Sequence, residues 1–316
     1  MKLHRFLLLA TWMVSAAHAG QLSFGLFGDT PYSHWERQHL PELIAEMDRE
    51  DLAFVVHDGD IKSGSGECSD AALRDILGVF RDSAHPLIYV PGDNEWTDCH
   101  RRSNGGYDPL ERLAKLRQLF FADDHALGRR GLRLERQSSD PAHSAYRDNV
   151  RWEAGGVLFV GLNVPGSNNN FEGAGGSGPA AEFRERSAAN RAWLAQAFAL
   201  ARERRLAGLL LVIQGNPGFH AANAGRPATG YAEFIEQLRD ETLAFPGQVV
   251  LVHGDTHQHR IDQPMEHPET GQTIANFTRV ETFGSPGFGW VKGSIDAAHP
   301  RLFRFEARMF RQAGIQ

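Results

Sequence analysis

The chain of 316 residues has few cysteines, few lysines and no excess of positive charge. Its two cysteines lack the spacing of a zinc knuckle. No apolar run after the N-terminal segment reaches the length that a transmembrane helix needs, and the N-terminal run itself is also too short. Acidic residues outnumber basic ones and give a formal net charge of −6. This balance argues against nucleic acid or an anionic membrane as a partner.

The first nineteen residues have the composition of a signal peptide. A basic start is followed by an apolar stretch over residues 6–14, and small residues, Ala17 and Ala19, precede Gly20. This stretch is too short to span a bilayer. We therefore predict a signal peptide over residues 1–19 and an exported protein, periplasmic or secreted, with no membrane anchor in the mature chain.

Six apolar runs of strand length end in glycine or a polar residue. Each is rich in Val, Leu, Ile and Phe and alternates little, which predicts strands buried on both faces. Segments with helical spacing lie between them, so the pattern predicts an α/β layered fold. The predicted strands are 22–29, 53–60, 86–93, 156–163, 209–216 and 248–255, and the predicted helices are 34–50, 69–82, 108–121, 188–204 and 231–245.

The C-terminal part has a different pattern. Residues 272–284 and 300–310 alternate apolar and polar side chains with no long helix between them, which predicts antiparallel strands. Residues 124–150 and 164–180 are polar or rich in Gly and Asn, and we predict loops there. Because neither a repeat nor a linker divides the chain, residues 20–316 are predicted to form a single domain.

Polar residues follow the predicted strands, where an open α/β sheet binds its ligands. One Gly-Asp pair is ordinary turn chemistry, but four of them should bring four carboxylates to one edge. Converging carboxylates repel unless cations or protons lie among them, so we predict a metal centre. Its candidate ligands are Asp29, Asp60, Asp93, Asn94, Gln214, Asp255 and His257.

Five sequence blocks carry a resemblance to a known family. "FGDTPY", "VVHDGDIKSG", "VPGDNEW", "VIQGNP" and "HGDTH" resemble, in order and spacing, the blocks of the calcineurin-like metallophosphoesterase superfamily. The resemblance implies a layered sandwich of mixed β-sheets flanked by helices, one or two divalent metal ions, and hydrolysis of phosphate esters. It also implies that Asp29 and His257 are ligands and that Asp60 bridges two metals.

Four blocks depart from the family pattern. Pro31 stands where the first block has a His ligand. In the third block Asp93 replaces the ligand Asn, and Asn94 replaces the His that assists the leaving group. Gln214 and Asp255 each replace a ligand His. Whether Asp93 or Asn94 is the ligand stays open at this point.

The resulting ligand set is rich in oxygen and has one imidazole. It favours Mn²⁺, Mg²⁺, Fe²⁺ or Ca²⁺ over Zn²⁺, which prefers His and Cys. Loss of the leaving-group His removes a proton donor that is worth roughly 10²–10⁴-fold in rate. The candidates to replace it are His34, His100, His253 and His259.

Loops after the predicted strands hold further candidate residues. Lys62, Arg101 and Asn163 are predicted to contact substrate. Cys68 and Cys99 lie in loops after two neighbouring strands, and we predict a disulfide between them that stiffens the rim of the site. A Cα separation above about 7 Å would exclude that bond.

Two functions follow from these features. The first is an exported phosphoesterase that hydrolyses a small-molecule phosphate ester by attack of metal-activated hydroxide, with Asp60 and Asn94 at the catalytic centre. The second is a catalytically weak or inactive module on the same fold that binds metal or phosphate. Asn and His positions that became Asp retain metal-binding chemistry, which favours the enzyme.

Overall fold

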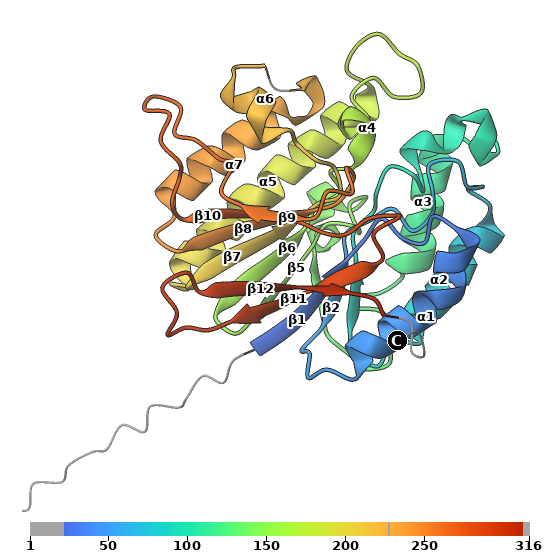
Figure 1. The fold of residues 1–316 in the computed structure, drawn as a ribbon. Helices are drawn as coiled ribbons and strands as arrows, with labels where there is room; N and C mark the ends of the chain where they lie inside the picture. Colours follow the sequence, from blue (N-terminus) through green and yellow to red (C-terminus); the bar gives the residue numbers. More distant parts are fainter. Residues whose placement is uncertain (1–21, 227, 312–316) are drawn as a thin grey trace, which may run out of the picture.

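The computed structural model describes residues 22–226 and 228–311, so the predicted signal peptide lies outside the described residues. Two mixed β-sheets pack against each other, and helices cover their outer faces (Figure 1). This arrangement confirms the predicted α/β sandwich of mixed sheets flanked by helices.

The first sheet has five strands in the order β12-β11-β1-β2-β3. β1, β2 and β3 run parallel, whereas β11 and β12 are antiparallel to their neighbours. β11 was not among the predicted strands. The bounds are β1 (Leu22–Phe27), β2 (Val55–His57), β3 (Leu87–Tyr89), β11 (Gly289–Ile295) and β12 (Phe303–Met309).

The second sheet has seven strands in the order β4-β5-β6-β7-β8-β10-β9. β10 lies between β9 and β8: it pairs antiparallel to β9, as predicted for this segment, and parallel to β8. The bounds are β4 (Glu135–Arg136), β5 (Val150–Ala154), β6 (Val157–Gly161), β7 (Gly208–Val212), β8 (Gln248–His253), β9 (Arg260–Asp262) and β10 (Phe277–Glu281).

Helices cover the outer face of each sheet (Figure 1). α1 (His34–Asp48), α2 (Asp70–Arg81) and α3 (Pro109–Phe120) pack on the five-stranded sheet, and α5 (Ala181–Glu203), α6 (Phe219–Asn223) and α7 (Ala232–Ala244) pack on the seven-stranded one. In the described residues, none of the helices combines the length and apolarity needed to cross a bilayer. Short 3₁₀ turns occupy 97–100, 102–104, 137–139, 141–143 and 229–231.

The parallel strands are apolar throughout because both of their faces are buried. In β1, Phe24 and Leu26 point between the sheets, while Phe27 points towards the helices. Rings from both sheets meet in the middle layer, where Phe24 and Phe54 each lie edge-on to Phe159. Burying such a side chain contributes about 1.5–3 kcal/mol. The strands that are buried on both faces therefore hold the layers of the sandwich together and fix the positions of the strand ends.

Candidate metal centre

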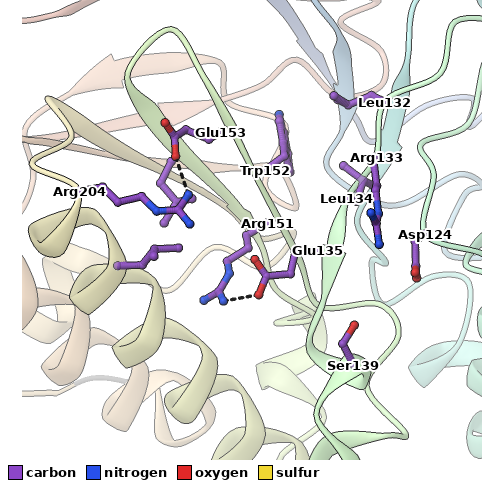
Figure 2. Close-up of a pocket in the computed structure, with 12 residues that line it drawn as sticks. Asp124, Leu132, Arg133, Leu134, Glu135, Ser139, Arg151, Trp152, Glu153 and Arg204 are labelled. Atoms are coloured by element: carbon purple, nitrogen blue, oxygen red, sulfur yellow. Dashed lines mark hydrogen bonds and ion pairs between the residues drawn. The ribbon is translucent and has the colours of Figure 1, made fainter.

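A cavity of about 300 Å³ lies beside the β5–β6 hairpin and the end of α5 (Figure 2). Its charged side chains are largely paired: Arg151 with Glu135, and Arg204 with Glu153 at 2.9 Å. The turn of this hairpin leads into the amino end of β6. The predicted ligands follow the carboxyl ends of the strands, so this cavity is separate from them.

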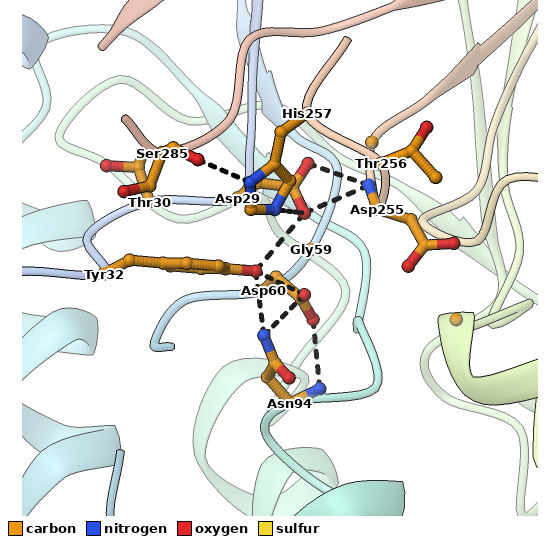
Figure 3. Close-up of polar contacts among 12 residues, drawn as sticks. Asp29, Thr30, Tyr32, Gly59, Asp60, Asn94, Asp255, Thr256, His257 and Ser285 are labelled. Atoms are coloured by element: carbon orange, nitrogen blue, oxygen red, sulfur yellow. Dashed lines mark hydrogen bonds and ion pairs between the residues drawn. The ribbon is translucent and has the colours of Figure 1, made fainter. Parts of the chain in front are cut away.

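Asp29 joins the two sheets at the carboxyl end of β1. Both of its carboxylate oxygens accept the backbone N–H of Asp255, each at 3.0 Å. The His257 Nε2 atom lies 3.5 Å from Asp29 Oδ1 (Figure 3). The side chain of Asp29 is fully buried. Residues 226 positions or more apart in the chain are thereby brought into one cluster.

Asp60 is held by Tyr32 and Asn94. The Tyr32 hydroxyl donates to Asp60 Oδ2 at 2.6 Å and lies 3.4 Å from Asp29 Oδ1. Asn94 donates its side-chain N–H groups to Asp60 Oδ2 at 2.7 Å and to the Tyr32 oxygen at 2.8 Å. The phenol oxygen therefore lies between two predicted ligands (Figure 3).

Asp93 and Asp255 approach each other across Gly166. A Cβ atom built on Gly166 would lie 2.5 Å from Asp93 Oδ1 and 2.7 Å from Asp255 Oδ1. Gly166 also donates its backbone N–H to the side-chain oxygen of Gln214. A larger residue at this position would displace the two carboxylates.

Ser167 follows directly and contacts a further carboxylate. Its hydroxyl lies 2.7 Å from Asp93 Oδ2 and 2.9 Å from Asp98 Oδ1. A hydroxyl has one proton, so it donates to only one of these groups. Burial and the charge of Asp93 raise the pKa of Asp98 to about 6, so Asp98 takes up a proton in mildly acidic solution.

Four predicted ligands have backbone in the left-handed region. Their φ angles are 47° at Asp29, 61° at Asp60, 75° at Asp255 and 58° at His257. Such conformations are uncommon outside glycine and cost of order 1–3 kcal/mol each. They turn each side chain sharply out of its strand and towards the cluster, which a continued extended chain would not do.

The segment α4 (Gly166–Asn169) is a left-handed turn rather than a right-handed helix. Residues 167–170 have φ values between 47° and 55°. Tyr231 helps to hold the turn by donating its hydroxyl to the Pro165 carbonyl at 2.8 Å. Arg186 donates to the carbonyl and side-chain oxygens of Asn169. This packing keeps Gly166 and Ser167 against the carboxylates.

Among the carboxylates of Asp29, Asp60, Asp93 and Asp255, that of Asp29 has the His257 imidazole as a basic neighbour. Within residues 22–226 and 228–311, none of them forms an ion pair with Arg or Lys. Burial raises the pKa of Asp29. Burial and the charge of Asp93 raise the pKa of Asp60 well above its ordinary value and that of Asp255 to about 7. The cluster therefore favours protons or cations.

A second layer of acids supports the cluster. Glu95 accepts the backbone N–H of Asp60 at 3.1 Å and of Gly92 at 2.6 Å, and the Tyr89 hydroxyl at 2.6 Å. These bonds fix the loops after β2 and β3 relative to each other. Sequence analysis assigns no role to Glu95, Tyr32, Ser167 or Asp98. Tyr32 lies in the first of the five sequence blocks, three residues after Asp29, but nothing in that block indicates where its side chain points.

The three predicted substrate-contacting residues have different surroundings. Lys62 lies next to the cluster, and its ammonium group donates to the Ser63 carbonyl at 3.1 Å. Arg101 is half-exposed at the rim and pairs with Asp98 at 2.6 Å. Asn163 is fully buried and donates to Asp148 at 2.7 Å.

The predicted disulfide between Cys68 and Cys99 is confirmed, with a Cα separation of 5.8 Å. It joins the loop after β2 to the short turn that follows Asp93, and both sulfur atoms are buried. Two of the loops that carry predicted ligands are thus linked covalently.

The four histidines considered as proton donors lie in different environments. His253 is fully buried, and burial lowers its pKa to about 4. His259 stacks on Phe283 with ring centroids 4.1 Å apart. His100 contacts the Thr97 carbonyl at 2.7 Å through Nδ1. His34 is exposed at the start of α1.

The donor chemistry of the cluster fits a hard divalent cation. Carboxylate oxygens dominate it, and Asp93 Oδ1 is buried without a hydrogen-bond partner. In the described part of the chain, no three His, Cys, Asp or Glu side chains already form a group that would hold a metal. The hydroxyls of Tyr32 and Ser167 instead separate the carboxylates.

Comparison by sequence finds no matching protein-family model and no curated protein with a significant match. Comparison by structure finds a dimetal phosphatase from Danio rerio at a TM-score of 0.53 and 13% identity, covering 91% of this chain and 96% of that one. The chain has the calcineurin-like metallophosphoesterase fold.

A second structure with this fold is a purple acid phosphatase from yellow lupin (Lupinus luteus) seeds. It matches at a TM-score of 0.51 and 12% identity, over 92% of this chain and 51% of that one. The metallophosphoesterase fold implied by the five sequence blocks is confirmed by these likenesses.

Proposed function

We propose that this protein is an exported, metal-dependent phosphoesterase that acts on a small-molecule phosphate ester. The observation that carries the proposal is the convergence of four carboxylates at the strand ends of this fold. Those of Asp29, Asp60 and Asp93 are buried and that of Asp255 is partly buried, and in the described residues none has an Arg or Lys ion-pair partner. Burying a carboxylate without a partner is costly. Divalent cations would neutralise the cluster and make that burial favourable.

Two groups of residues would hold the metal ions. Asp29 and His257 would form one group, and Asp93, Gln214 and Asp255 would form the other. Asp60 would serve both, since Tyr32 links it to Asp29 and the charge of Asp93 acts on it. Bound divalent ions would supply Lewis-acid polarisation of the phosphate and a nucleophile at neutral pH.

The side chains around the metal groups would orient the ligands and the substrate. Asn94 holds both Asp60 oxygens through its side chain and its backbone N–H. As an amide it donates hydrogen bonds but does not transfer a proton to the leaving group. Arg101, fixed by Asp98 at the rim, would contact the phosphoryl oxygens. A leaving group that departs without protonation suits this arrangement.

Export is supported by two features. The N-terminal segment has the composition of a signal peptide, and the Cys68–Cys99 disulfide is of a kind that persists in oxidising compartments. A periplasmic or secreted location would satisfy both. Fractionation of cells that produce the full-length chain, with N-terminal sequencing of the mature protein, tests this part; an uncleaved cytosolic protein contradicts it.

The alternative is a binding module that has lost turnover. The position of the Tyr32 hydroxyl between Asp29 and Asp60 favours it, since the phenol occupies space that a bridging ion would need. Such a module would bind one ion or none and would retain phosphate without hydrolysing it.

Metal analysis combined with activity separates the two functions. Purified wild-type protein and the Asp60→Asn variant are loaded with Mn²⁺, Mg²⁺, Fe²⁺ or Ca²⁺, dialysed, analysed for metal and assayed on phosphomonoesters and phosphodiesters. We expect bound metal and hydrolysis in the wild type, and loss of both in the variant. Wild-type protein that binds metal yet hydrolyses none of the esters supports the binding module instead.

A further inference from the structure

A cleft of about 290 Å³ adjoins the carboxylate cluster. Its walls come from the start of α1, the loop after β2 and the first turns of α2. Tyr32 and Lys62 belong to both places: they line the cleft, and they contact or adjoin the residues around Asp60. A phosphate held at the cluster would therefore direct its ester substituent towards this cleft.

Apolar atoms make up most of the exposed surface of the cleft, and the polar residues Ser33, His34 and Ser63 also line it. Pro31, Ile61, Leu73 and Ile76 line it together with the ring of Tyr32. Ile61 and Leu73 are each 1% exposed and form the packed floor of the cleft, whereas Tyr32 and Ala72 are partly exposed and present accessible surface. A flat apolar group that enters the cleft would bury its surface against them.

The charges in the cleft do not favour a second anionic group. Arg37 donates two hydrogen bonds to Asp75, at 2.5 and 2.6 Å, so the carboxylate neutralises the guanidinium. Glu67 adds a negative charge at the rim. The Lys62 ammonium lies at the side that adjoins the cluster, where it would face the phosphate.

We propose that this cleft binds the leaving group of the substrate and that the substrate is a phosphate ester of an aromatic or other flat apolar alcohol. The inference rests on the proposed function and deepens it. The volume suits one ring or two fused rings, and the mainly apolar exposed surface of the cleft favours an apolar group over a polyphosphate. A phenol-like leaving group also departs readily without a proton donor, in keeping with Asn94 at the position of the family's His.

Binding of two non-hydrolysable probes tests the cleft. Titration calorimetry of the Mn²⁺-loaded protein compares phenylphosphonate with methylphosphonate, which carry the same anionic group and differ in the ring. We expect phenylphosphonate to bind at least about tenfold more tightly, since a buried ring adds more than 1.4 kcal/mol. Equal affinities would overturn the proposal.

A variant that fills the cleft locates the preference. Ala72 lines the cleft on α2, whereas the neighbouring Ala71 is exposed and does not. Ala72→Trp should abolish the preference for phenylphosphonate and leave methylphosphonate affinity unchanged. Ala71→Trp is the matched control and should keep the preference. Ala72→Leu, a smaller change, should reduce it if the Trp variant folds poorly; an unchanged preference in a folded Ala72 variant contradicts the proposal.

The outcomes distinguish this inference from the proposed function. Wild-type protein that hydrolyses esters but binds both probes equally retains the function and loses the aromatic cleft. Wild-type protein that binds neither probe and hydrolyses nothing overturns both.

Discussion

Asp60 and Asp148 are both buried carboxylates, yet their pKa values shift in opposite directions. Burial raises the pKa of Asp148, but the Arg117 guanidinium, 2.8 Å away, and the Asn163 amide outweigh burial and lower it overall. Burial and neighbouring carboxylates raise that of Asp60. The Arg117 guanidinium lies against Asp148, whereas in the described residues Asp60 has no Arg or Lys ion-pair partner. In the proposed function, an external cation would bind at the acid that lacks such a partner.

Exchange of each acid for its amide should give the largest contrast. In Asp60→Asn we expect loss of bound metal and at least about 10³-fold lower hydrolysis, while the metal-free protein becomes no less stable. In Asp148→Asn the Arg117 charge loses its partner, which should lower the free energy of unfolding by about 3 kcal/mol.

Metal analysis, ester hydrolysis and urea unfolding in EDTA measure these effects. The contrast between the two acids fails if Asp60→Asn destabilises the metal-free protein as much as Asp148→Asn does. In that case the Asp60 carboxylate would be a structural group like Asp148.

The disulfide holds the loops that carry the cluster but does not hold the network around Asp148. Its removal therefore sharpens the comparison between the two acids. The bond joins residues 31 positions apart, so the Cys68→Ser/Cys99→Ser variant should lose about 3–4 kcal/mol of unfolding free energy. Metal affinity should fall as well. Urea unfolding and metal titration measure both quantities, and a variant with wild-type metal affinity would show that the loops need no covalent support.

The Arg101–Asp98 pair offers a smaller change at the rim. Arg101→Ala should lower kcat/KM about tenfold, mainly through KM, because the guanidinium would contact the phosphoryl group. Arg101→Lys should recover part of the loss. Steady-state kinetics measures the effect, with exposed Arg74→Ala as a control that leaves kcat/KM unchanged. Wild-type kinetics in Arg101→Ala would exclude substrate contact.

The smallest expected effect is the pH dependence of metal-free stability. The pKa of Asp255, raised to about 7, means that its proton binds more tightly in the folded state. Stability is then lost as pH rises through that value. Buried His57 and His253, whose pKa values burial lowers to about 3 and about 4, act oppositely, but only below about pH 6.5.

Between about pH 6.5 and 8 we therefore expect a loss of about 1 kcal/mol in EDTA. Mn²⁺ should remove this loss by replacing the protons. Urea unfolding across this range measures it, and a free energy of unfolding that rises with pH would contradict the raised pKa values.

The sequence predicted those residues of the cluster that directly follow strands. Asp29, Asp60, Asp93 and Asp255 were found because each closes an apolar run, and parallel strands end at one edge. Asn163 was found by the same rule, yet its side chain turns to Asp148 inside the protein. The rule fixes where a residue lies but does not fix where its side chain points.

The sequence by itself determined the layered sandwich, the positions of the strand ends and the pairing of Cys68 with Cys99, because apolar runs and loop order are local properties of the chain. Only the tertiary structure decided that Tyr32, Ser167 and Gly166 enter the cluster. Their placement depends on left-handed turns and on contacts between distant segments, such as that of Ser167 with Asp93 across 74 residues, and neither property is written in any local pattern.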